Sequence, residues 1–283
     1  MNESAAIGFA GLWHRFRRNR AAVGGLILLA AIVVAAAFGP LIYAVDPFDM
    51  LGRPSTVPSA RFPLGTDVSG RDILAGLLHG ARVSLLIGIA ASVAATLVGL
   101  VVGATAGYFG GWIDAVLMRA TDFFLTIPSF VLAVLIVAIF QPSVLMITLS
   151  IAIVSWPSVA RLARAEFVAH EKRDYVDACR AMGMSHAEII MRQILPNALP
   201  PVIVIASLMV ATAILTESGL SFLGLGDPNI ISWGYMIGVG RTVLRTAWWM
   251  SAVPGVTILV TVLAINLVGE GLNEALNPRM RQQ

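Results

Sequence analysis

The sequence predicts an all-α integral membrane protein with six transmembrane helices, and three observations carry that prediction. First, 58% of the 283 residues are hydrophobic and only 12% are charged, whereas soluble domains are about 25% charged. Second, no charged residue occurs at positions 83–113 or 123–160. Third, the basic residues flank the apolar runs. Lipid is the solvent that suits such helices, because a soluble fold of this size could not cover them on all sides.

The first part of the chain is expected to cross the membrane once. Residues 1–20 form a basic segment that we place in the cytosol, and residues 21–45 form the first transmembrane helix. Ala35-Ala36-Ala37 resembles a signal-peptide cleavage site, but the run is long enough to span ~30 Å of hydrocarbon and further spans follow, which favours an uncleaved helix. Residues 46–82 are expected to form an external loop that ends in an interfacial amphipathic helix, Gly70–Arg82. The Arg82 side chain is expected to snorkel toward water.

Residues 83–272 are expected to form the core domain, with five further transmembrane helices at 83–106, 123–140, 143–160, 198–222 and 251–269. Gln141-Pro142 predicts a turn between the third and fourth spans. Three glycines four residues apart, Gly99, Gly103 and Gly107, would let another helix approach the second span closely. The loop before the last span carries aromatic residues typical of a membrane interface: Trp233, Tyr235, Trp248 and Trp249. Residues 273–283 then form a short cytosolic tail.

The distribution of arginine and lysine predicts the orientation. With both termini in the cytosol, the inner segments carry thirteen basic residues and the outer segments carry six, which satisfies the positive-inside rule. The isoelectric point near 9.5 is therefore explained by membrane orientation, and we expect no nucleic-acid partner.

No pattern in the chain predicts catalysis. The four histidines are scattered, the single cysteine, Cys179, has no second thiol to pair with, and no metal-ligand spacing occurs. The chain has one lysine, Lys172, which follows Glu171 and therefore cannot belong to a phosphate-binding loop. We expect no enzyme activity and no bound cofactor or metal, so any ATP hydrolysis would belong to another polypeptide.

The charged segment 161–197 carries the most specific local signals. Gly183 is expected to end a short helix in the left-handed conformation. Ser185-His186-Ala187-Glu188 then predicts a capping box, with Met184 and Ile189 as its hydrophobic staple. Such a corner fits either a solvated cytosolic hairpin or a rigid docking element. The adjacent apolar residues 189–191 favour docking, since they cannot all face the protein interior.

This segment resembles the EAA loop of ABC importer permeases. The resemblance rests on Asp177-Ala178-Cys179-Arg180-Ala181-Met182-Gly183 followed by Ile194-Leu195-Pro196-Asn197, with Asp177 and Cys179 departing from the family pattern. Further segments are similar to the dipeptide, oligopeptide and nickel subfamily, and to the second of its two permease types. They are Leu64-Gly65-Thr66-Asp67, Gly107-Tyr108-Phe109-Gly110-Gly111-Trp112, Leu220-Ser221-Phe222-Leu223-Gly224-Leu225-Gly226 and Asn266-Leu267-Val268-Gly269-Glu270-Gly271-Leu272.

The resemblance implies a type I ABC importer permease fold in a bacterial cytoplasmic (inner) membrane. It implies a homologous permease partner, two cytosolic ABC ATPase subunits or a fused equivalent that use ATP and Mg²⁺, and an external solute-binding protein. The chain would form half of the translocation pathway for di- or oligopeptides. The residues expected to couple to the ATPases are Ala178, Gly183, Met184, Ser185, His186, Glu188 and Arg192, flanked by Glu171, Arg173 and Asp174.

Glu217 is the one acidic residue expected inside a span, with Ser221 one turn further on. A carboxylate near the bilayer centre costs ~3 kcal/mol on insertion scales and should face the bundle interior or a water-filled path. Two interpretations stay open: a residue of the translocation pathway, or a structural group hydrogen-bonded by neighbours such as Thr216 or Ser218.

Three other functions are open on the sequence. The same architecture could import nickel, glutathione or haem. An ion-coupled secondary transporter would need intramembrane ionisable pairs and internal repeats, of which the chain shows only Glu217. A membrane scaffold without transport is the third.

Overall fold

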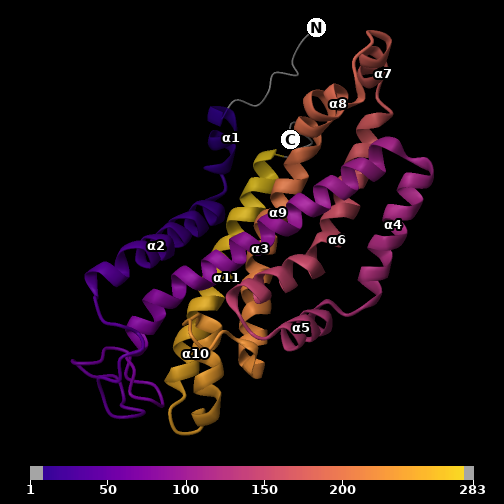
Figure 1. Cartoon of the computed structure of the whole chain (residues 1–283). Helices are drawn as coiled ribbons and strands as arrows, with labels where there is room; N and C mark the ends of the chain where they lie inside the picture. The colour runs from indigo at the N-terminus through magenta and orange to yellow at the C-terminus, as the bar shows by residue number, and fades with distance from the viewer. Residues whose placement is uncertain (1–8, 277–283) are drawn as a thin grey trace.

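The structure is a computed structural model that describes residues 9–276, and its regular secondary structure over that range is helical, with no strand longer than an isolated bridge. Figure 1 shows a bundle of long helices. The elements are α1 (Phe9–Phe16), α2 (Arg20–Ile42), α3 (Ile73–Phe109), α4 (Gly111–Thr126), α5 (Ser129–Phe140), α6 (Val144–Glu171), α7 (Asp174–Ala181), α8 (His186–Glu188), a π-helical turn (Ile189–Ile194), α9 (Leu195–Leu220), a second π turn (Ser221–Leu225), α10 (Trp233–Gly240), a 3₁₀ turn (Arg241–Val243) and α11 (Trp249–Leu276).

Up to six membrane crossings lie among the described residues, and the third of the six predicted spans is broken. Five helical segments are long and apolar enough to span a bilayer, and the sixth crossing is the pair α4 and α5, which are bent by 83°. The prediction of one helix over 123–140 is therefore wrong. Ile127 has an extended backbone (φ −90°, ψ 129°), because the residue before a proline is excluded from the helical region and Pro128 follows it.

The predicted interfacial helix at 70–82 is also wrong. α3 begins directly after its N-cap, Asp72, and continues for 37 residues, so the second crossing includes this segment. Ile73 and Ala75 are buried, and a Cβ added to Gly80 would lie 3.3 Å from Trp233. The apolar side of the segment packs against protein instead of lipid headgroups, which is why no separate surface helix forms.

The glycine spacing on the second span has the predicted consequence. α3 and α6 pack so closely that a Cβ added to Gly103 would lie 2.3 Å from the carbonyl oxygen of Ala160 and 2.7 Å from the Cβ of Ala163. Only glycine fits at this crossing. The same close approach occurs at Gly99 and Gly107, one turn to either side, so α3 and α6 pack against each other over several turns within the bundle (Figure 1).

The Arg82 side chain is exposed, as expected, and its guanidinium also bonds to the backbone of α2. Its Nε donates to the carbonyl oxygen of Ala36 at 2.6 Å and its Nη2 donates to that of Ala37 at 2.7 Å. Pro40, inside α2, has no N–H for the Ala36 carbonyl four residues earlier. Arg82 supplies the missing donor and thereby ties α2 to α3.

Trp233 is not part of an interfacial belt. Its side chain is 1% exposed, its indole N–H donates to the carbonyl of Leu77 at 3.0 Å, and its backbone N–H donates to the Ser84 hydroxyl at 3.1 Å. Trp248, at 63% exposed, has the exposure expected of an interfacial residue. The buried Trp233 therefore fastens α10 to α3.

The connection between α2 and α3 is held by side-chain bonds at both ends. The hydroxyl of Tyr43 donates to the Asp72 carboxylate, and this bond raises the pKa of Tyr43 to about 12. The other carboxylate oxygen of Asp72 caps α3 by accepting from the Leu74 N–H at 2.8 Å. This loop and α10 lie at one end of the bundle, whereas α1, α7, α8 and the last turns of α11 lie at the other (Figure 1).

Candidate functional site

A sharp turn between α7 and α8 forms the most regular local feature of the chain; we call residues 174–194 the elbow. Gly183 has φ +75°. The Gly183 N–H donates to the carbonyl of Arg180 at 3.0 Å, and the Met184 N–H donates to that of Cys179 at 3.1 Å. These two bonds define a Schellman motif, in which a left-handed glycine ends the helix. The space around Gly183 is open to 4 Å, so the backbone conformation, not crowding, requires glycine here.

The capping box predicted at the start of the next helix is present. The backbone N–H of Glu188 donates to the Ser185 hydroxyl at 3.3 Å, and the backbone N–H of Ser185 donates to the Glu188 carboxylate at 3.3 Å. Met184 and Ile189, the predicted staple pair, belong to the same apolar cluster. The corner is therefore specified on both sides of Gly183.

An apolar cluster anchors the elbow to the bundle. Its buried members come from α3, α6, α7, the first π turn and α9: Tyr108, Phe167, Val176, Cys179, Ile189, Ile194 and Ala198. Full burial of such side chains stabilises packing by about 1.5–3 kcal/mol each. The elbow is thus part of the same packed body as the long helices.

The elbow continues into the fifth crossing without a loop. Residues His186–Leu225 form one helical segment of 40 residues, in which the π turn Ile189–Ile194 joins α8 to α9. A π turn widens the helix by one residue. Pro196 therefore lies at the start of α9 within a continuous helical segment and does not end it.

The predicted coupling residues divide into three groups by their surroundings. Met184 is half-buried in the cluster, and His186, although exposed, is tied to α3 by a 2.8 Å bond between its Nδ1 and the Tyr108 hydroxyl. The flanking residue Glu171 is engaged in an ion pair with Arg180 at 2.6 Å, which raises the pKa of the Arg180 guanidinium. The remaining members are exposed: Ala178, Gly183, Ser185, Glu188 and Arg192.

Two exposed methionines on the elbow were not predicted as site residues. Met182 is 72% exposed and Met191 is 60% exposed, although Ile189 beside them is fully buried. The signal for Met191 was available, since three consecutive apolar residues on a helix cannot share one face. Met182 lies at the C-cap of α7, where sequence alone does not reveal the direction of the side chain. Flexible methionines are typical of surfaces that bind a partner.

Glu217 and Ser221 lie together at the opposite end of α9. Glu217 is 1% exposed, and its Oε1 accepts from the hydroxyls of Ser221 at 2.8 Å and Ser232 at 2.6 Å. The partners are thus not Thr216 or Ser218, whose hydroxyls donate to backbone carbonyls one turn earlier. The carboxylate joins α9 to Ser232, the N-cap of α10, while its Oε2 has no partner.

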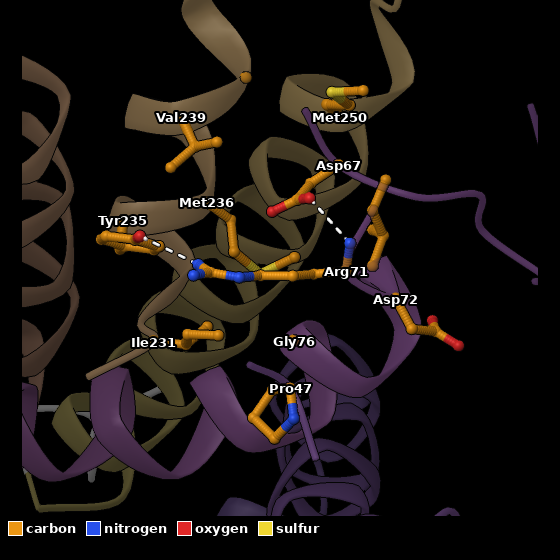
Figure 2. A pocket seen from close by; sticks show the side chains of 12 residues that line it. Pro47, Asp67, Arg71, Asp72, Gly76, Ile231, Tyr235, Met236, Val239 and Met250 are labelled. Atoms are coloured by element: carbon orange, nitrogen blue, oxygen red, sulfur yellow. Dashed lines mark hydrogen bonds between the residues drawn. The ribbon is translucent and has the colours of Figure 1, made fainter. Parts of the chain in front are cut away.

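Two cavities lie near α10. Figure 2 shows the smaller one, in which the Arg71 guanidinium reaches across to the Tyr235 hydroxyl. Its volume is about 30 Å³, which is enough to hold a water molecule. The second cavity has a volume of about 220 Å³ and its polar lining consists of Ser221, Tyr235 and Arg241. Within residues 9–276, no three His, Cys, Asp or Glu side chains come together as metal ligands would.

Apolar crossings with a capped elbow at one end define a polytopic α-helical membrane protein, and comparison with known proteins gives its family. Residues 99–282 match the family described as binding-protein-dependent transport system inner membrane component, and residues 9–55 match the N-terminal transmembrane domain of oligopeptide transport permease C. The chain belongs to this family of ABC importer permeases.

The sequences of known relatives match this chain over nearly its whole length. The di/tripeptide transport system permease protein DppC of Pseudomonas aeruginosa is 42% identical over 277 residues, covering 95% of this chain and 91% of its own length. The dipeptide transport system permease protein DppC of Escherichia coli K12 is 41% identical, covering 95% and 93%. A permease chain of the inward-facing MetNI methionine ABC transporter has the same fold, with a TM-score of 0.60 at 18% identity over 71% of this chain and 96% of its own.

Proposed function

We propose that this chain is the permease subunit of an ATP-driven importer of di- or oligopeptides and that it forms half of the translocation pathway. The peptide substrate is supported by the relatives at about 40% identity, which are named as dipeptide or tripeptide permeases. Nickel, glutathione and haem importers would share the architecture, but none of these relatives is named for such a cargo. Membership of a binding-protein-dependent family speaks against an ion-coupled transporter or a scaffold.

The proposed partners follow from the family to which the chain belongs and from the lack of a phosphate-binding loop in its sequence. A homologous permease would complete the pathway, an external solute-binding protein would deliver the peptide, and two cytosolic ABC ATPase subunits or a fused equivalent would use ATP and Mg²⁺. This chain would bind no cofactor and catalyse no reaction. With the elbow in the cytosol, α1 and the end of α11 lie on the same side (Figure 1), so both chain ends would be cytosolic, as the positive-inside rule predicts.

The observation that carries the coupling role is the anchoring of an exposed, capped elbow by a buried cluster. Met182, Met191 and Arg192 are exposed on the elbow and available to a partner, whereas Ile189 and Ile194 pack into the bundle. Closure of the ATPases on ATP binding would then move the elbow and the fifth crossing together, and the pathway would alternate between inward and outward access.

The docking role is tested by thiol protection in the assembled transporter. Met182→Cys and Met191→Cys should react readily with a maleimide after the ATPase subunits are stripped away and at least about tenfold more slowly when they are bound. The wild-type chain is the control for background labelling, because its one cysteine, Cys179, is buried. Trp248→Cys, at the other end, should react at the same rate in both states.

Equal reactivity of Met182→Cys and Met191→Cys with and without the ATPases would contradict docking at the elbow. The peptide substrate is tested separately, by binding-protein-stimulated ATP hydrolysis and uptake of a labelled dipeptide in proteoliposomes that contain the whole assembly. Absence of dipeptide uptake alongside uptake of nickel, glutathione or haem would overturn the cargo and leave the coupling role intact.

A further inference from the structure

The 220 Å³ cavity at the α10 end has the chemistry of an anion site. Arg241 is the one charged residue in its lining, together with the hydroxyls of Ser221 and Tyr235; the rest is apolar or glycine: Gly224, Gly226, Pro228, Gly238 and Val239. One water molecule needs about 10–15 Å³ of such space, so the cavity has room for several waters, or for the end of a small peptide.

The donors of this cavity are arranged so that they remain available. Arg241 donates Nη1 to the carbonyl of Phe222 and stacks on the Phe222 ring at 5.4 Å. These contacts orient the exposed guanidinium, while its Nη2 lies beside Gly224, where an added Cβ would be 3.9 Å away. An oriented guanidinium with an uncommitted N–H edge is suited to recognise a carboxylate.

Tyr235 supplies a second donor. Its hydroxyl oxygen accepts from the Arg71 Nη1 at 3.3 Å (Figure 2). That bond uses a lone pair of the oxygen, so the phenolic hydrogen is free to donate toward the cavity. The cation behind Tyr235 strengthens this donor, since hydrogen bonds in a chain polarise one another.

The nearby carboxylates do not line the cavity. Asp227 is occupied at the start of α6, where its Oδ2 accepts from the Val144 N–H at 3.2 Å, and its Oδ1 accepts from the Asn229 N–H at 2.9 Å. Glu217 lies behind Ser221, which donates to it. The Ser221 oxygen keeps lone pairs that can accept a hydrogen bond from an ammonium group. Arg241 provides the positive charge of the cavity lining.

We propose that this cavity binds the free C-terminal carboxylate of a peptide as it passes the α10 end of the permease, with Arg241 and Tyr235 as donors. The inference rests on the proposed peptide transport. A carboxylate could also come from an acidic side chain of the docked solute-binding protein, so the experiment has separate arms for the two sources.

The test places a reporter thiol in the cavity of the whole assembly in nanodiscs. Val239→Cys, whose side chain lines both cavities, is labelled with an uncharged maleimide, without the binding protein. Alanylalanine should slow labelling and its C-terminal amide should not. In the Arg241→Gln background, the dipeptide concentration that gives half-protection should rise about tenfold or more, because a charge-assisted pair is lost.

Matched variants separate recognition from structure. Gln at 241 keeps an N–H donor for the Phe222 carbonyl but no charge, so a purely structural role predicts no change in protection. Arg241→Lys should restore part of the protection. Arg245→Gln removes an exposed charge that lies outside the cavity lining and should leave protection unchanged.

Three results would overturn the proposal: equal protection by the amide, undiminished protection in Arg241→Gln, or protection that requires the binding protein and is the same with and without peptide. The last would assign the carboxylate to the binding protein. Failure of the proposed function itself looks different, because wild-type proteoliposomes would then lack binding-protein-dependent dipeptide uptake, whatever happens at Val239→Cys.

Discussion

The two ends of one helical segment, His186–Leu225, use the same pair of side chains for different purposes. At the elbow, Ser185 and Glu188 are exposed and satisfy the backbone of a helix start. At the other end, Ser221 and Glu217 are buried, and the carboxylate also accepts from Ser232 across to α10. The exposed serine–glutamate pair stabilises only the first turn of α8, whereas the buried pair belongs to a network that holds α9 against α10. Loss of the buried pair should therefore cost more.

The largest effect is expected for Glu217→Val. Two buried hydroxyls would lose their acceptor, which should lower the free energy of unfolding by about 3 kcal/mol. Glu217→Gln has nearly the same volume and keeps an acceptor oxygen, so it should cost about 1 kcal/mol. Thermal unfolding of the solubilised assembly measures both. Equal losses would refute the tethering role, and a stable Glu217→Gln assembly without uptake would place Glu217 in the pathway.

Replacement of Gly183 should come next. A β-branched residue at φ +75° is strained by about 1–2 kcal/mol, so Gly183→Val should distort the elbow while insertion into the membrane is retained. Binding-protein-stimulated ATP hydrolysis and uptake should fall together. Gly183→Asn is the control, because asparagine tolerates the left-handed region. Normal transport by Gly183→Val would count heavily against coupling through the elbow.

The capping box should give a smaller, local effect. Ser185→Ala removes the N-cap acceptor and should destabilise the first turn of α8 by about 1 kcal/mol. Because both residues serve one box, the Ser185→Ala, Glu188→Ala double variant should lose less than the two single losses combined. Amide hydrogen exchange at residues 186–189 reports this directly. Strict additivity would show that the two side chains act independently.

The smallest change in stability is expected for Arg192→Ala. Its ion pair with Glu188 is long, at 3.5 Å, and exposed, and such pairs contribute less than about 0.5 kcal/mol. Its effect should instead appear as weaker association of the ATPase subunits, measured by titration of purified ATPases onto the permease pair. Unchanged ATPase affinity would remove Arg192 from the docking surface.

The sequence was most informative where the rules are local. Gly183, Ser185 and Glu188 act over six residues, so the turn and the capping box could be predicted in detail. The glycine spacing around Gly103 likewise predicted a close helix crossing, though not that α6 is the partner. Non-local contacts could not be read in this way: Ser232 lies fifteen residues from Glu217, and helix spacing offers only Ser221.

The errors have physical causes of the same kind. Trp233 fits the composition of an interfacial belt, but packing against α3 buries it. Residues 70–82 have an amphipathic pattern, and sequence alone does not say whether lipid headgroups or α10 covers the apolar side. The break at Pro128 was detectable, because Ile127 precedes a proline, but the uncharged run around it suggested one continuous span.

The absence of a loop between the elbow and the fifth crossing has a mechanical consequence. At ~1.5 Å per residue, the 35 residues from His186 to Leu220 reach about 50 Å, up to the last turn, which is kinked at Gly224. If this rod pivots near its midpoint, a tilt of about 10° displaces each tip by about 5 Å in opposite directions. An ATPase bound at the elbow would then move the opposite end of the helix, and the hydrogen bond between Glu217 and Ser232 would move α10 with it.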